Sequence, residues 1–174
     1  LYAMTQLQTT FGIILLALVG GQPKVLSLRE ILDEYIAHQK NVIVRRTKYD
    51  LRKAEERAHI LEGLHIAVNN LDEVIRIIRS SYDNAKQRLM ERFELSDAQA
   101  QAILELQLRR LQGLEIEKIE AELREIELKI ADYKDILAND YRVVGILKDE
   151  LTAIRNRYGD ERKTEIELID DEID

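Results

Sequence analysis

A heptad pattern in the second half of the chain constrains the fold most. From Glu115 onward, apolar side chains recur at alternating spacings of three and four residues, which is typical of a coiled-coil seam. The seam residues are Ile116, Ile119, Leu123, Ile126, Ile130, Tyr133 and Leu137. The pattern fails at Ala138, Asn139 and Asp140, where we expect a break in the helix and a candidate hinge. It then resumes with Val144, Leu147, Leu151, Ile154 and Tyr158.

An earlier stretch predicts a helical arm of matching length. Ser27 and Glu30 form a capping box, and no Pro or Gly follows until Gly63, which predicts a helix about 50 Å long. Its predicted apolar stripe runs through Tyr35, Val42 and Tyr49, seven residues apart, and then on a shifted line through Leu51, Ala54, Ala58 and Leu61. The arms, 28–62 and 115–158, are predicted to pack antiparallel as a stalk.

The block between the arms, 63–114, is predicted to form a helical knob. Asn70 and Glu73 open a short helix, and a capping box of Ser96 and Gln99 opens another, which Gly113 is expected to stop. This last helix is apolar around more than one face, so one face is expected to meet the chain's own core and another a second copy. The predicted dimer interface is Leu71, Val74, Ile75, Ile78, Ile103, Leu106, Gln107, Arg110 and Leu111. Periodicity does not separate the residues that face the partner from those that face the core.

Short β elements are expected at the base of the stalk. Residues 11–19 form an apolar run, Gly20 to Pro23 read as a turn, and 24–27 form a second short run, which together predict a β-hairpin within 1–27. Because the first strand is apolar on both faces, a neighbouring domain is expected to cover it. The segment 159–174 is expected to hold a terminal strand over 164–169 and an acidic tail. The predicted fold class is mainly α.

Charge and composition narrow the function. The net charge of −7 and the pI near 5.2 argue against a stand-alone nucleic-acid-binding domain. The chain has no Cys, which suits a cytoplasmic location, and its longest apolar run, 11–19, is too short to span a bilayer as a helix. His38, His59 and His65 lack metal-pair spacing, so no metal or catalytic residue is predicted. The start at Leu1 suggests a piece of a longer protein.

One basic concentration lies in the first arm. Its cations are Arg45, Arg46, Lys48, Arg52, Lys53 and Arg57, interleaved with carboxylates. Two readings stay open: a salt-bridged face that meets the acidic second arm, or a surface that contacts nucleic acid.

Six segments together resemble the A subunit of bacterial DNA gyrase, a type IIA topoisomerase. They are LYAMTQLQTTFG (1–12), GQPK (21–24), RRTKYDL (45–51), RAHILEG (57–63), AQAQAIL (98–104) and TEI (164–166). They follow the family's order and span nearly the whole chain. The related A subunit of topoisomerase IV is an alternative. The GQPK turn and the DERKTEI ending (160–166) resemble gyrase more than topoisomerase IV. A coiled-coil scaffold unrelated to DNA is the alternative from another class, and it would explain the heptads but not these segments.

The resemblance implies a role and a set of partners. In this family the A subunit carries a long antiparallel coiled coil that ends in a small helical domain, and two such domains form the exit gate for the transported duplex. It implies a homodimer through that gate, an A2B2 complex with the B subunit, and Mg²⁺ and ATP bound by the B subunit. The family's catalytic Tyr matches no segment here, so the chain alone is expected to be inactive.

Overall fold

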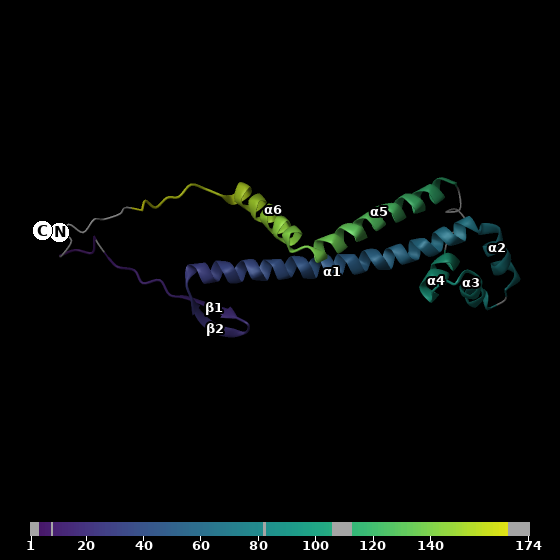
Figure 1. Ribbon diagram of the computed structural model, residues 1–174, viewed down its shortest axis with the longest axis horizontal. Helices are drawn as coiled ribbons and strands as arrows, with labels where there is room; N and C mark the ends of the chain where they lie inside the picture. The colour runs from purple at the N-terminus through teal and green to yellow at the C-terminus, as the bar shows by residue number, and fades with distance from the viewer. Residues whose placement is uncertain (1–3, 8, 82, 106–112, 167–174) are drawn as a thin grey trace.

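The computed structural model describes residues 4–7, 9–81, 83–105 and 113–166, and it is mainly helical. A stalk of long helices carries a knob of short helices at one end and a β-hairpin toward the other (Figure 1). In chain order the elements are β1 (Leu15–Val19), β2 (Gln22–Leu26), α1 (Leu28–Asn69), α2 (Leu71–Ser80), α3 (Ala85–Phe93), α4 (Asp97–Leu104), α5 (Gly113–Ala138) and α6 (Asp140–Tyr158). None of the described helices is both long enough and apolar enough to cross a membrane.

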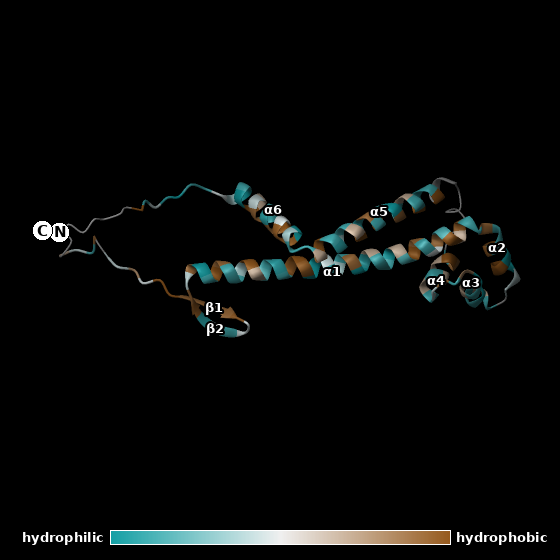
Figure 2. Cartoon of the chain, in the orientation of Figure 1, coloured by the Kyte–Doolittle hydropathy of each residue, from teal (hydrophilic) through white to brown (hydrophobic). Residues whose placement is uncertain are grey.

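The predicted hairpin is confirmed, with a shorter first strand. Strands β1 and β2 pair antiparallel from Leu15 opposite Leu26 to Val19 opposite Gln22. The turn residues Gly20 and Gly21 have φ of 60° and 80°, which suits a tight hairpin turn that needs positive φ at both central positions. Strand β1 is strongly hydrophobic (Figure 2), yet Leu16 and Leu18 remain exposed. The described residues therefore leave one apolar face of the hairpin uncovered.

Helix α1 forms the backbone of the stalk. The predicted capping box is present, because the Ser27 hydroxyl accepts from the Glu30 amide and the Glu30 carboxylate accepts from the Ser27 amide. The helix has 42 residues and a length of about 63 Å. It runs through Gly63 to Asn69, so the expectation that the arm ends near Gly63 is wrong. Gly63 is buried inside the helix, where its missing side chain lets another helix approach.

The register predicted for the first part of α1 is also wrong. Tyr35, Val42 and Tyr49 are exposed, whereas Ile43 and Thr47 are buried against the second arm. Thr47 is tolerated there because its hydroxyl donates to the Ile43 carbonyl at 2.9 Å. The continuation of the stripe farther along is confirmed: Leu51 and Ala54 are half-buried, and Ala58 and Leu61 are buried.

Helix α5 runs back along α1 from the knob (Figure 1), which confirms the predicted antiparallel packing of the two arms. It begins at Gly113, so the prediction that this glycine ends a helix is wrong. Ile136 of α5 packs with Ile43 of α1 and with Val143 and Leu147 of α6 in a small core.

Helix α6 turns away from α1 (Figure 1), so the seam closes only at its beginning. Val143 is buried where Val144 was predicted, and Leu147 is buried as predicted. Leu151, Ile154 and Tyr158 are exposed, because no described element covers that side of α6. Of the expected terminal strand, the described residues 164–166 form no strand, and 167–169 lie outside the described residues.

Candidate functional site

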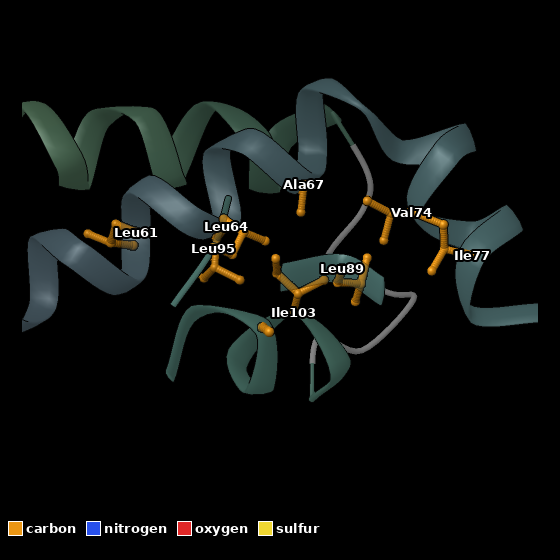
Figure 3. Close-up of a cluster of buried hydrophobic side chains, with 9 residues drawn as sticks. Leu61, Leu64, Ala67, Val74, Ile77, Leu89, Leu95 and Ile103 are labelled. Carbon is orange, nitrogen blue, oxygen red and sulfur yellow. The ribbon is translucent and has the colours of Figure 1, made fainter. Parts of the chain in front are cut away.

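The knob is built around one hydrophobic core. Helices α2, α3 and α4 fold back on the last turns of α1 (Figure 1) and bury nine apolar side chains together (Figure 3). They are Leu61, Leu64, Ala67, Val74, Ile77, Leu89, Leu95, Ala100 and Ile103. Burying a side chain of the size of Val or Leu stabilises a fold by roughly 1.5–3 kcal/mol at most, so this cluster is enough to hold short helices that would not form alone.

Helix α4 is attached to α1 by a polar contact through Gln99. The Gln99 amide nitrogen donates to the His59 carbonyl at 2.7 Å, while its amide oxygen accepts from the Ser96 backbone N–H at 2.9 Å. His59 Nε2 lies 2.7 Å from the Ser96 hydroxyl. One buried side chain therefore completes the predicted capping box of α4 and joins that helix to the stalk.

Gly63 makes this close approach possible. A Cβ atom built at Gly63 would lie 2.7 Å from both Cβ and Cγ of Gln99, closer than side chains tolerate. Because glycine often ends a helix, the sequence pattern predicts a helix end at Gly63. The contact with Gln99, 36 positions later in the chain, carries no signal in local periodicity.

The structure divides the predicted dimer residues into two groups. Val74 and Ile103 lie in the chain's own core, with 4% and 3% of their surface exposed. Leu71 and Ile75 are half-buried, and Ile78 is 38% exposed. Because positions 71, 75 and 78 share one face of a helix, these three form an apolar stripe beside the core-facing side of α2. Leu106, Gln107, Arg110 and Leu111 lie outside the described residues.

One ion pair and two further hydrogen bonds from arginine join α2 to α3. Arg92 of α3 donates from Nε and Nη2 to the two carboxylate oxygens of Glu73 in α2, at 2.7 and 3.2 Å. This hydrogen bonding lowers the pKa of Glu73 and raises the pKa of Arg92. Arg88 donates to the hydroxyls of Ser80 and Ser81 at 3.0 and 2.8 Å.

The predicted seam residues of α5 are all half-buried. Ile119, Leu123 and Ile126 pack against the knob core, and Tyr133 packs against the small core of the stalk. Ion pairs flank this contact: Arg57–Glu122 at 2.7 Å and Lys134–Glu55 at 3.0 Å. The stalk and the knob are thus joined by continuous packing.

The helix break lies at the predicted residues. Helix α5 ends at Ala138, α6 begins at Asp140, and Asn139 between them has extended backbone angles. The Asn139 amide donates to the Asp135 carbonyl and carboxylate at 3.0 and 2.7 Å. Arg142 donates to Asp132 and Asp135, both at 2.7 Å, and the contact with Asp132 raises the pKa of Arg142. These bonds define the bend, and motion at the candidate hinge stays a prediction.

Among the described residues, no group of three or more His, Cys, Asp or Glu side chains is arranged to hold a metal ion. The features that the geometry does offer are a long lever, a compact tip, and a bend between two helices.

Comparison with known proteins gives the family. The sequence profile that describes the A subunit of DNA gyrase and topoisomerase IV matches residues 1–152. The chain is 58% identical to the DNA gyrase A subunit of Halalkalibacterium halodurans, over 98% of the chain and 21% of that protein. It is 55% identical to the same subunit of Streptococcus pneumoniae, over 95% of the chain and 20% of the relative, and 52% identical to that of Staphylococcus aureus strain MRSA252, over 97% and 19%. The chain thus spans about one fifth of the length of these relatives. It belongs to the family formed by the A subunits of DNA gyrase and topoisomerase IV.

Proposed function

We propose that this chain is the exit-gate dimerisation module of a DNA gyrase A subunit. In this role two copies meet at their knobs, hold the two A subunits together, and part to release the transported duplex. The stripe of Leu71, Ile75 and Ile78 carries the proposal, because it is apolar, lies on the knob and is not used fully by the chain's own core. A stable interface buries about 800 Å² on each partner, so the stripe would be one part of a larger contact.

The long lever favours a gate over a simple dimer contact. Helix α1 places the knob core, which begins at Leu61, about 50 Å from the hairpin. A dimer contact at such a distance can open by bending of the stalk, which costs less than separating packed domains along their whole length. The bend at Asn139 is where we place that motion.

We infer the activity of the parent protein from the family. We propose an ATP-dependent type II topoisomerase that introduces negative supercoils in the cytoplasm. It would act as an A2B2 complex with the B subunit, which would hold ATP and Mg²⁺. The catalytic Tyr would lie in a part of the A subunit outside this chain, so the chain alone is expected to be inactive. Gyrase is preferred to topoisomerase IV because the relatives named above are gyrase A subunits.

Sedimentation equilibrium over a wide concentration range tests the dimer. We expect a mass of about twice 20.3 kDa for the wild type and a monomer for Ile78→Asp, since the new carboxylate would be buried without a partner at the contact. The matched control is Leu128→Asp, which places the same charge at a 73% exposed apolar residue on α5 and should leave the dimer intact. A wild-type monomer at high concentration, or equal effects of both substitutions, would refute the assignment of the stripe.

A further inference from the structure

Charge is distributed unevenly along the stalk. The chain carries a net charge of −7, yet residues 45–57 of α1 hold six cations and three carboxylates. The middle of α1 is therefore basic within an acidic protein. The ion pairs of the structure show which of these cations are already neutralised.

Two of the cations point to the second arm. Arg46 pairs with Glu150 of α6 at 2.7 Å, and Arg57 pairs with Glu122 of α5 at 2.7 Å. This part of the basic stretch is the predicted salt-bridged face. The charges of Arg46 and Arg57 are thus neutralised within the stalk.

The other side of the helix is different. Arg45 and Lys48 have no acidic partner within the part of the chain that the structure describes, and Arg52 has only a 3.8 Å contact with Glu56, which also accepts from Lys53. Positions 45, 48 and 52 share one helix face. That face lies opposite Ile43 and Thr47, the residues buried against the second arm. We call Arg45, Lys48 and Arg52, with Tyr49 beside them, the outer basic face.

Tyr49 adds to the character of this surface. Its side chain is 54% exposed, and the Arg52 guanidinium lies 5.4 Å from the ring centroid. Because the ring already restricts the Arg52 side chain, less conformational entropy is lost when the guanidinium binds an anion. The face runs about 10 Å from Arg45 to Arg52.

We propose that the outer basic face contacts the phosphate backbone of duplex DNA. The inference rests on the proposed function, in which a transported duplex leaves between two copies of this chain. A duplex presents a negative charge about every 1.7 Å along its axis, so a row of three cations about 10 Å long finds phosphates in any register and any sequence. A protein partner would instead be expected to meet an apolar centre with a polar rim, and the outer basic face has no aliphatic centre.

The small number of cations fits a passing contact. Each phosphate contact releases counterions, so three contacts give a weak, salt-sensitive attraction, whereas tight binders make about six to ten. The acidic remainder of the chain opposes retention of the duplex. The outer basic face would therefore orient the duplex without trapping it.

Photocrosslinking in the complete enzyme tests the contact. The full-length A subunit, assembled with its B subunit, would carry p-benzoylphenylalanine at Lys48 or, as matched control, at Arg46 on the same helix. Both enzymes would be irradiated while they supercoil plasmid DNA with ATP. We expect a protein–DNA adduct at position 48 that exceeds the adduct at position 46 several-fold. An enzyme that supercoils the plasmid but gives no such excess at position 48 overturns the proposal.

Charge variants supply the second measurement. Arg45→Gln with Lys48→Gln should lower the supercoiling rate severalfold at physiological salt, while the swap Arg45→Lys with Lys48→Arg should keep it, which excludes a folding defect. Arg46→Gln with Arg57→Gln removes the same charge from the same helix and should have the smaller effect. Equal effects of the two Gln pairs overturn the proposal. A dimeric chain without the adduct refutes only the DNA contact, and an adduct from a chain that stays monomeric refutes only the gate.

Discussion

At the scale of single residues, Gly63 shows how one missing side chain shapes the knob. The helix gains intrinsic stability when glycine is replaced by alanine, about 1 kcal/mol in a helix interior. Here the new methyl group would lie 2.7 Å from the stem of Gln99, which is held at both ends of its amide. Overpacking of this kind costs roughly 1–3 kcal/mol, so the clash exceeds the gain.

We predict that Gly63→Ala lowers the free energy of unfolding by about 1 kcal/mol. Gly145 is the control, because it lies within α6 with nothing within 4 Å of a Cβ atom, so Gly145→Ala should raise the same quantity by about 0.5–1 kcal/mol. Urea unfolding followed by circular dichroism measures both. If Gly63→Ala were as stabilising as Gly145→Ala, the close contact with Gln99 would not be as described.

Residues such as Gly63 and Thr47 also mark what the sequence could not predict. Capping boxes at Ser27 and Ser96 were predictable because their hydrogen bonds join residues only three apart. The burial of Ile43 and Thr47 was not predictable, because a cleaner seven-residue repeat runs through Tyr35, Val42 and Tyr49. That repeat lies on the side of α1 that faces away from the second arm. A pattern within one helix shows that a stripe exists, whereas the choice between two stripes depends on the partner helix.

At the scale of helices, the pair of α2 and α3 is predicted to respond to acid. The contact with Arg92 lowers the pKa of Glu73 in the folded chain relative to its ordinary value. A carboxyl whose folded pKa is depressed contributes stability above the unfolded pKa and loses it as the pH falls through the folded pKa. We therefore expect this contribution to be complete at pH 7 and to disappear as the pH falls below about 4.

The measurement compares wild type and Glu73→Gln by urea unfolding between pH 7 and pH 3. The stability difference between them should shrink on acidification, because Gln cannot titrate. Glu91→Gln on α3 is the control, since Glu91 accepts from the Gln87 amide rather than from a cation. A difference between wild type and Glu73→Gln that stays constant with pH would contradict the role of this ion pair.

The break between α5 and α6 is the second prediction at this scale. Asn139→Ala with Asp140→Leu removes the amide bonds to Asp135 and the Lys40–Asp140 pair at 2.7 Å, and it favours one continuous helix. If the gate opens by bending here, the full-length enzyme should supercoil DNA more slowly. Spin labels at the exposed Ala37 and Ala153 should show a narrower distance distribution in the variant.

Asp149→Leu with Asn156→Ala is the matched control, because it changes the same residue types at exposed positions within α6. It should leave both the supercoiling rate and the distance distribution near their wild-type values. An unchanged rate in the Asn139 and Asp140 variant would show that the gate does not depend on this bend.

At the scale of the whole molecule, the architecture was more predictable than its contacts. Heptads, caps and the hairpin turn are local signals, and they predicted two antiparallel arms, a helical knob and a hairpin at the base. The division of the knob residues was not predictable: Val74 and Ile78 lie four positions apart on α2, yet one is buried and the other is exposed. Helices α1 and α3, which pack against α2, decide that difference, and periodicity within α2 does not show on which side they lie.

A dimer that forms through the knob should make stability depend on protein concentration. Association stabilises the folded state because the unfolded chain does not dimerise, so the midpoint of thermal unfolding should rise with concentration. For two chains of this size we expect a rise of about 2 °C for each tenfold increase in concentration. Scanning calorimetry over two decades of concentration measures it. Ile78→Asp should abolish the dependence while the monomer still unfolds cooperatively, whereas Leu128→Asp should preserve it. A midpoint that is independent of concentration in the wild type would mean that the stripe of Leu71, Ile75 and Ile78 does not hold two copies together without the remainder of the protein.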